Sequence, residues 1–228
     1  MSTVLAARPR LAFLLAGIAG FVDAVGFLTL FGLFTAHLSG NTARLGVELG
    51  RGDAAAALAY AVPIAVFIGA VFVGAATTAA ARSRGRTALA PLLAAEAVLV
   101  AVFMVLGTLL RDAGDLTPRS AAYYALAATI VTAMGLQTAS LRHVCGIAVQ
   151  TTFITGMVVS FAEELVAAVR GDDADASRRA GVHGLLLGAY LGGAVAGSAL
   201  DTAWSLWALT VPVAALVALT AAGVERSA

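Results

Sequence analysis

Long apolar runs constrain the fold of this chain more than any other feature. A helix needs about twenty apolar residues to cross the hydrocarbon core of a bilayer. Six runs have about this length or more: Leu11–Phe31, Ala55–Ala81, Ala88–Leu110, Ala121–Leu141, Gly181–Leu200 and Trp204–Ala222. Only 12% of the 228 residues are charged, about half the share in soluble domains. We therefore predict an all-α polytopic membrane protein with residues 1–228 in a single membrane domain, since the runs are too long for barrel strands.

Two polar segments interrupt this pattern and leave the number of crossings open. Thr35–Gly50 and Val144–Val169 carry many hydrogen-bonding side chains between predicted spans. With six spans these segments are re-entrant or interfacial, and with eight they cross fully. Either count divides the arginines ten to four, but eight spans would put the acid-free turn RSRGR (82–86) outside, against the usual placement of arginine. We therefore expect about six spans with both termini in the cytoplasm.

The cationic residues also indicate the source of the chain. All fourteen are arginine, a usage typical of high-GC bacterial genomes. For a multi-pass helical protein from such a source we expect location in the bacterial cytoplasmic (inner) membrane.

The two halves of the chain resemble each other in the spacing of their glycines. Successive intervals are 20, 29 and 5 residues in the first half and 21, 32 and 5 in the second, between Gly20, Gly40, Gly69 and Gly74 and between Gly135, Gly156, Gly188 and Gly193. Chance similarity in a glycine-rich chain is the alternative to duplication. Because three spans form each unit, duplication predicts two inverted repeats, about 11–111 and 119–223, a common plan of secondary transporters.

A further glycine series predicts helix packing. Gly184, Gly188 and Gly192 recur every four residues in the fifth span, and such spacing lets helices approach closely. We expect their partner to be the second span, through Gly69 and Gly74, with a homodimer as the alternative.

Three stretches resemble a known family. GFVDAVGFLTLFGLFTAHLSGNTARLG, GLQTASLR and QTTFITG are similar to the YoaK family of bacterial membrane proteins, grouped as domain of unknown function 1275. The resemblance covers nearly the whole chain and implies about six spans, but it implies no settled activity.

Two acidic residues lie deep in predicted spans. Counted by helix rise, Asp23 lies about 18 Å into the first span and Glu96, in the third span, about 15 Å beyond Arg86, so we expect both at similar depth. An ionised carboxylate at mid-bilayer costs at least about 2.5 kcal/mol. The two carboxyl groups either share a proton and act as a proton or cation relay, accept structural hydrogen bonds from Ser, Thr or backbone amides, or lie far apart.

The polar segments supply the other candidates for a solute or ion pathway. Ser39, Gly40, Asn41 and Thr42 resemble a helix start, where Ser and Asn cap exposed amides and the positive helix end suits an anion or a carbonyl oxygen. Self-capping without a ligand is the alternative. His37 is a candidate proton carrier. The remaining candidates are Gln137, Arg142, which otherwise snorkels to the headgroups, and the second-half counterparts Thr151, Thr152, Thr155 and Gly156.

These features favour a transporter over the other function classes. One cysteine, Cys145, cannot form a disulfide or a cysteine metal site within one chain, and we expect no cofactor, no metal and no enzyme activity, since no known catalytic motif occurs. Net charge near zero gives no sign of a nucleic-acid partner. The predicted partners are the lipid bilayer and a small solute or ion, with a non-transporting scaffold as the alternative.

Overall fold

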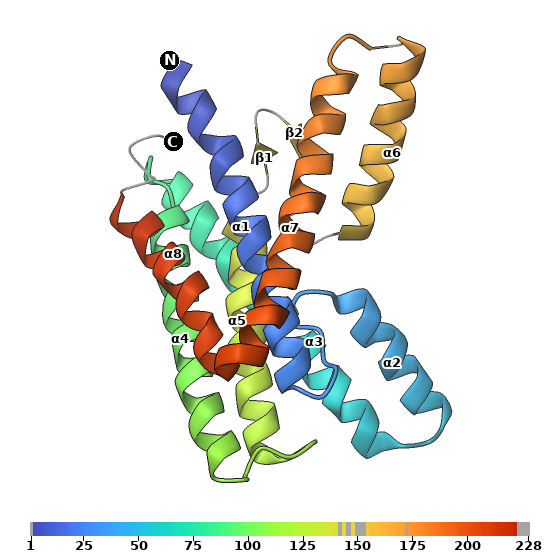
Figure 1. Cartoon of the computed structure of the whole chain (residues 1–228), viewed down its shortest axis with the longest axis vertical. Coiled ribbons are helices and arrows are strands. Elements are labelled where there is room, and N and C mark those ends of the chain that lie inside the picture. Colours follow the sequence, from blue (N-terminus) through green and yellow to red (C-terminus); the bar gives the residue numbers. More distant parts are fainter. Residues whose placement is uncertain (1, 141–142, 145–146, 149–153, 172, 223–228) are drawn as a thin grey trace.

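The computed structural model describes residues 2–140, 143–144, 147–148, 154–171 and 173–222. These residues form eight α-helices, one 3₁₀ helix and a two-residue hairpin of strands (Figure 1). In chain order the elements are α1 (Ser2–Thr29), α2 (Leu38–Gly50), α3 (Ala54–Arg82), α4 (Leu89–Asp112), α5 (Ala121–Ser140), β1 (His143–Val144), β2 (Ile147–Ala148), α6 (Ile154–Arg170), α7 (Ala176–Trp204), η1 (Ser205–Leu209) and α8 (Thr210–Ala221). Each of the six predicted spans coincides with a helix, the sixth with η1 and α8 together.

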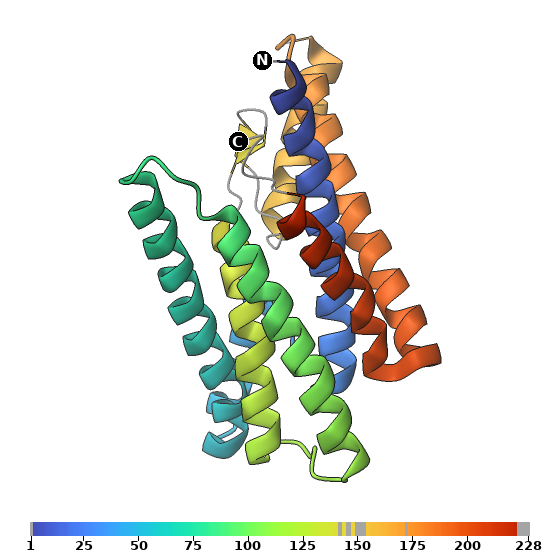
Figure 2. The same cartoon turned by 90° about the vertical axis from the view of Figure 1, so that its left-hand side faces the viewer.

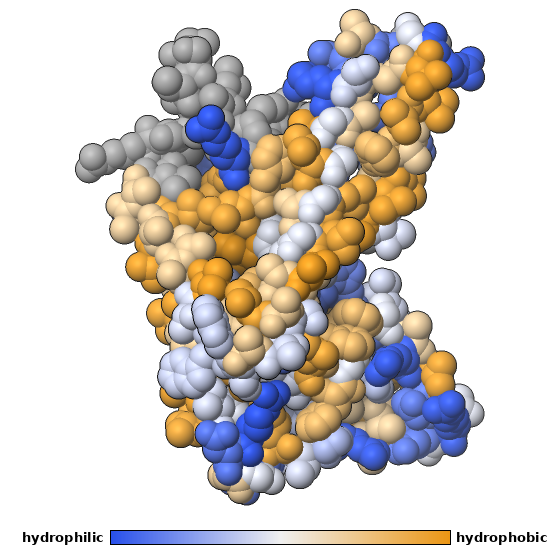
Figure 3. All heavy atoms as spheres, in the orientation of Figure 1, coloured by the Kyte–Doolittle hydropathy of each residue, from blue (hydrophilic) through white to orange (hydrophobic). Residues whose placement is uncertain are grey.

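Four helical stretches are long and apolar enough to cross a membrane: Arg10–Thr29, Ala54–Arg82, Leu89–Asp112 and Ala176–Ala221. The last contains both α7 and α8, because the chain turns at Ser205 (φ 53°) and η1 before α8 begins. The structure is therefore that of a helical membrane protein. Figure 3 agrees, with apolar side chains over the middle of the molecule and hydrophilic ones gathered toward its two ends.

The predicted span at Ala121–Leu141 forms α5 but is not among the four apolar stretches. Helix α5 lies between α3 and α4 (Figure 2) and contacts both. Most of its side chains are buried against these neighbours, among them Leu126, Ile130 and Met134. A helix surrounded by protein needs less hydropathy than one surrounded by lipid, because its polar atoms find partners in other helices.

The long helices alternate in direction. The turns that follow α3 and α6 lie at the same end of the molecule as the N-terminus, and the turns that follow α2 and α4 lie at the other end (Figures 1 and 2). Helices α2 and α6 each end in an RGD tripeptide, where Gly52 (φ 74°) and Gly171 (φ 73°) stop the helix with a backbone conformation that glycine adopts readily.

Two helix crossings at close range organise the core. In one, α1 packs along α7, where Gly20 lies against the Tyr190 backbone and Gly193 against the Gly17 backbone. In the other, α3 packs along α5, where Gly135 faces Ala70 and Gly74 faces Ala139. The expected pairing of the fifth span with the second is therefore wrong. Glycine at every fourth position shows that one face of a helix carries small residues, but it does not show which helix packs on that face.

Candidate functional site

Asp23 is the centre of a buried polar cluster in the second half of α1. The residue is 3% exposed. Its Oδ1 accepts three hydrogen bonds from the loop after α1: from the backbone N–H of Thr35 (2.7 Å), the hydroxyl of Thr35 (2.9 Å) and the N–H of Ala36 (2.9 Å). A buried amide without a partner costs about 1–3 kcal/mol. One carboxylate oxygen therefore stabilises the loop after α1, which lies outside any helix or sheet. This is the alternative in which Asp23 accepts structural hydrogen bonds from threonine and backbone amides.

The other oxygen of Asp23 joins this loop to α7. His37 Nδ1 lies 2.6 Å from Oδ2, and the hydroxyl of Tyr190 donates to the same oxygen at 2.7 Å. The rings of His37 and Tyr190 meet edge to face with centroids 5.2 Å apart. Because Oδ2 is an acceptor, His37 Nδ1 carries the hydrogen. The His37 side chain is 21% exposed, so the cluster is not completely closed off from the surface.

Asn41 ties the same loop to α2. Its Oδ1 accepts from the N–H of Phe34 (3.1 Å) and its Nδ2 donates to the carbonyl of Phe34 (2.7 Å). Gly40 packs against the Phe34 ring, 3.0 Å from where a Cβ would stand. A helix does start at the predicted segment: α2 begins at Leu38, with His37 as N-cap. The predicted capping chemistry is wrong, because Asn41 binds the preceding loop instead of the helix amides.

The remaining first-half candidates lie at the surface of α2. Ser39 and Thr42 are exposed, and the Thr42 hydroxyl donates to the carbonyl of Leu38 at 2.8 Å.

Both short helices begin beside the middle of α7. His37 precedes α2 and contacts Tyr190, the fifteenth of the 29 residues of α7. Ile154, the first residue of α6, packs in a cluster with Leu187 and Ala189. With 13 and 17 residues, α2 and α6 are shorter than the roughly twenty residues that a crossing needs. Figure 3 shows an indentation of the surface between them.

The second-half candidates are placed only in part. Thr155 is exposed and Gly156 is half-buried, both in the first turn of α6. Arg142, Thr151 and Thr152 lie outside the described residues.

Glu96 is buried like Asp23, but its surroundings are apolar. Its side chain lies on the face of α4 that carries Leu93, Val100 and Phe103, and the residue is 0% exposed. Neither carboxyl oxygen has a hydrogen-bond partner among the described residues. Asp23 and Glu96 are therefore not joined by a hydrogen bond, and the hypothesis of a proton shared directly between them is wrong.

Gln137 lies on α5, and one of the two polar atoms of its side chain is hydrogen-bonded to a described residue. Its Nε2 donates to the carbonyl of Leu15 in α1 at 2.7 Å, while its buried Oε1 has no partner among the described residues. Gln137 thus links α5 to α1 and leaves one acceptor unpaired in the core.

Sequence reasoning missed two participants. Tyr190 completes the Asp23 cluster from 167 positions away, and its only signal was a hydroxyl within the glycine-rich LGAYLGGA. His183 was given no role, yet its Nδ1 lies 2.7 Å from Glu164, which also binds Arg179 at 3.3 Å. The structure thus contains a second carboxylate–histidine pair, between α6 and α7. No group of three or more His, Cys, Asp or Glu that would hold a metal occurs among the described residues.

One family model matches residues 11–222, and its description is "Protein of unknown function (DUF1275)". The chain belongs to this DUF1275 family. The match confirms the resemblance noted in the sequence and covers all the helices from the first predicted span onward. A search of curated proteins and a search of solved structures gave no match, so the family supplies no activity for the cluster around Asp23.

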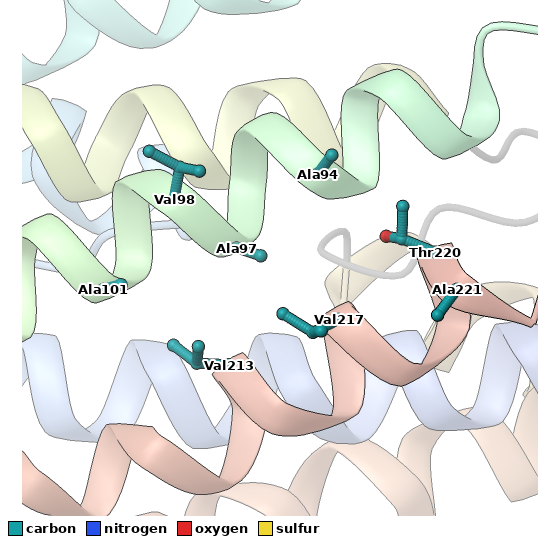
Figure 4. Close-up of a pocket in the computed structure, with 8 residues that line it drawn as sticks. All are labelled: Ala94, Ala97, Val98, Ala101, Val213, Val217, Thr220 and Ala221. Carbon is teal, nitrogen blue, oxygen red and sulfur yellow. The ribbon is translucent and has the colours of Figure 1, made fainter.

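One apolar groove lies on the flank of the DUF1275 fold. It measures about 440 Å³ and runs between α4 and α8 (Figure 4). Apart from Thr220 its walls are apolar: Ala94, Ala97, Val98 and Ala101 from α4 and Val213, Val217 and Ala221 from α8. The groove lies at the level of Glu96 on α4, but Glu96 is not among its walls.

Proposed function

We propose that this protein is a small-solute or ion transporter of the bacterial inner membrane, with six crossings arranged as two inverted repeats. The matched crossings α1–α7 and α3–α5 support the repeat, because each pairs the first long helix of one half with the helix after the short helix of the other. The alternating helix directions support six crossings.

One observation carries this proposal. Two helices too short to cross begin at mid-length of α7, beside a cluster in which the buried Asp23 is bonded to the half-buried His37 and Tyr190. Broken helices that end at mid-membrane depth at the interface of two repeats form the substrate site in many secondary transporters. The amides at the helix start and the Nε2 of His37 are the groups available to a polar solute there.

Permeation through reconstituted liposomes tests the proposal. We would measure stopped-flow osmotic swelling with glycerol, urea, sodium formate, sodium acetate and ammonium chloride as probes. We expect the wild-type protein to speed the entry of at least one probe relative to protein-free liposomes. His37→Gln should change that rate, whereas His183→Gln, which alters the carboxylate–histidine pair away from α2, should leave it unchanged.

Equal rates with and without protein for every probe would contradict a transporter. The alternative is then a membrane scaffold. Two features favour it: both oxygens of Asp23 are hydrogen-bonded within the protein, and the apolar groove between α4 and α8 is a surface that a partner could cover. Recovery of a partner protein in a fixed stoichiometry, together with absent permeation, would establish that alternative.

A further inference from the structure

Glu96 is a buried acid without a visible counter-charge. It occupies the centre of the buried face of α4, and α4 packs against α5, η1 and α8. The titratable side chains of α5 are Tyr123 and Tyr124, at the opposite end of that helix, and η1 and α8 have none. Helix α1 contributes Asp23, whose oxygens are bonded to the loop, His37 and Tyr190. Among the described residues an ionised Glu96 would therefore stand unpaired in the core, which costs several kcal/mol.

Gln137 lies at nearly the same level. Helices α4 and α5 are antiparallel, and Gly107 faces Leu126 while Leu92 clusters with Leu136. This register places Glu96 within about one helical turn of Gln137. Gln137 binds Leu15 of α1, so Glu96 is level with that residue, about two turns from Asp23 along α1. The two carboxyl groups are thus separate in depth as well as in partners.

The unpaired atoms of the two side chains are complementary only in one protonation state. Gln137 Oε1 is an acceptor, and a carboxylate has acceptors alone, so no hydrogen bond forms between them. A protonated carboxyl group has one O–H donor. Adding one proton from water to Glu96 therefore removes the unpaired charge and supplies a donor for Gln137 Oε1. Three side-chain oxygens in a packed core are too few for a metal cation, which takes six or more oxygens.

We propose that Glu96 is a proton-binding site inside the bundle, neutral in the resting protein, with its O–H directed to Gln137 Oε1. The inference does not require transport. If the protein transports, Glu96 is the residue through which protons would be coupled to it.

Infrared spectroscopy of the purified protein tests this protonation directly. A protonated carboxylic acid has a carbonyl stretch that a carboxylate lacks. We expect this band at neutral pH in wild type and in Asp23→Asn, and its loss in Glu96→Gln. Gln137→Leu should retain the band at higher frequency, because the carbonyl of a carboxyl group without a hydrogen-bond partner absorbs higher. Absence of the band in wild type at neutral pH would overturn the proposal.

Chemical labelling supplies an independent readout. Dicyclohexylcarbodiimide enters apolar sites and reacts with protonated carboxyl groups: the carboxyl oxygen bonds to the central carbon, the proton passes to nitrogen, and the adduct rearranges to an N-acylurea. The apolar groove between α4 and α8 lies on a neighbouring face of α4, at the level of Glu96 (Figure 4). Mass spectrometry should find the adduct on Glu96 in wild type and none at that position in Glu96→Gln. Glu164 is the internal control and should stay unmodified, because its carboxyl group is paired with His183 and Arg179.

Two labelling results would overturn the proposal. One is a Glu96 that stays unmodified in wild type. The other is protection of Glu96 by sodium chloride at constant pH and ionic strength, which would assign the site to a metal cation. Glu96→Gln mimics the neutral acid in shape, so we expect it to fold with unchanged thermal stability. Marked destabilisation would likewise contradict a neutral Glu96.

Discussion

The α1–α7 and α3–α5 crossings share a backbone plan and differ in chemistry. Each brings a helix against a glycine of its partner, Gly193 or Gly74, at matched positions of the two halves. Three residues after the matched glycines Gly20 and Gly135, α1 has Asp23 and α5 has Thr138, whose hydroxyl donates to the carbonyl of Met134 in its own helix. Three residues before Gly193 and Gly74, α7 has Tyr190 and α3 has Val71. Among the described residues, the similarity between the halves therefore reflects helix packing, while the carboxylate–histidine–tyrosine cluster occurs at the α1–α7 crossing.

The backbone contact of α1 with α7 gives the largest expected effect. A Cβ at Gly20 would collide with the backbone of Tyr190, which no side-chain rotation relieves. We expect Gly20→Val to destabilise the protein by at least about 4 kcal/mol, seen as loss of the monodisperse peak and of the thermal transition in detergent. Gly188→Val, where a Cβ would meet open space, is the matched control and should behave as wild type.

The second crossing sharpens this prediction. A Cβ at Gly135 would lie 2.6 Å from the Cβ of Ala70 and 3.2 Å from the carbonyl oxygen of Phe67. Because the closest atom is a side-chain carbon, Gly135→Val should destabilise less than Gly20→Val. The reverse order would show that α3–α5 is the tighter crossing.

Removal of the Asp23 carboxylate should have the next largest effect. Asp23→Ala leaves two backbone amides, a threonine hydroxyl, His37 and Tyr190 without their common acceptor. Loss of one side of a buried charged network costs about 3–5 kcal/mol, which thermal unfolding would record. Asp23→Asn keeps an acceptor for the loop and should lose less. Equal losses for the two variants would mean that the charge of Asp23, and not its loop hydrogen bonds, stabilises the fold.

Substitution of Tyr190 tests the hydrogen bond between Asp23 and α7, and its expected effect on stability is smaller. Tyr190→Phe keeps the ring and removes one hydrogen bond to a charged acceptor, a loss of about 1.5–3 kcal/mol. Tyr124→Phe makes the same chemical change on the far side of the bundle, where the ring packs on Tyr123, and should shift the melting temperature less. If the two shifts are equal, the contact with Asp23 adds nothing beyond packing.

The sequence predicts most of this fold but few of its contacts. Apolar runs and glycine stops locate helices such as α3 and α4 to within one or two residues, because crossing length and helix termination are local properties. Helix rise alone puts Asp23 and Glu96 at similar depth, but the packed helices separate them by about two turns along α1. Depth and side-chain direction both depend on how the helices are shifted and rotated against one another in the bundle. The bond between Asp23 and Tyr190 therefore appears only once α1 and α7 are packed, and the unpaired state of Glu96 only once α4 meets α5.

The turns after the two short helices, α2 and α6, also differ between the halves. Substitution there should have the smallest effect on stability. In the first half, Asp53 Oδ1 accepts from the N–H of Ala56 and caps α3 (2.9 Å). In the second half, Asp173 instead pairs with Arg179 at 2.6 Å, and this hydrogen bond lowers the pKa of Asp173. A carboxylate with a lowered pKa stabilises the fold above its ordinary pKa, and this contribution is lost as pH falls through the folded value. We therefore expect Asp173→Asn to lower the melting temperature slightly at neutral pH and to match wild type in acid. Water screens such an exposed pair, so the shift should also shrink in high salt, and a shift that persists in acid or in salt would mean that Asp173 acts through its backbone turn.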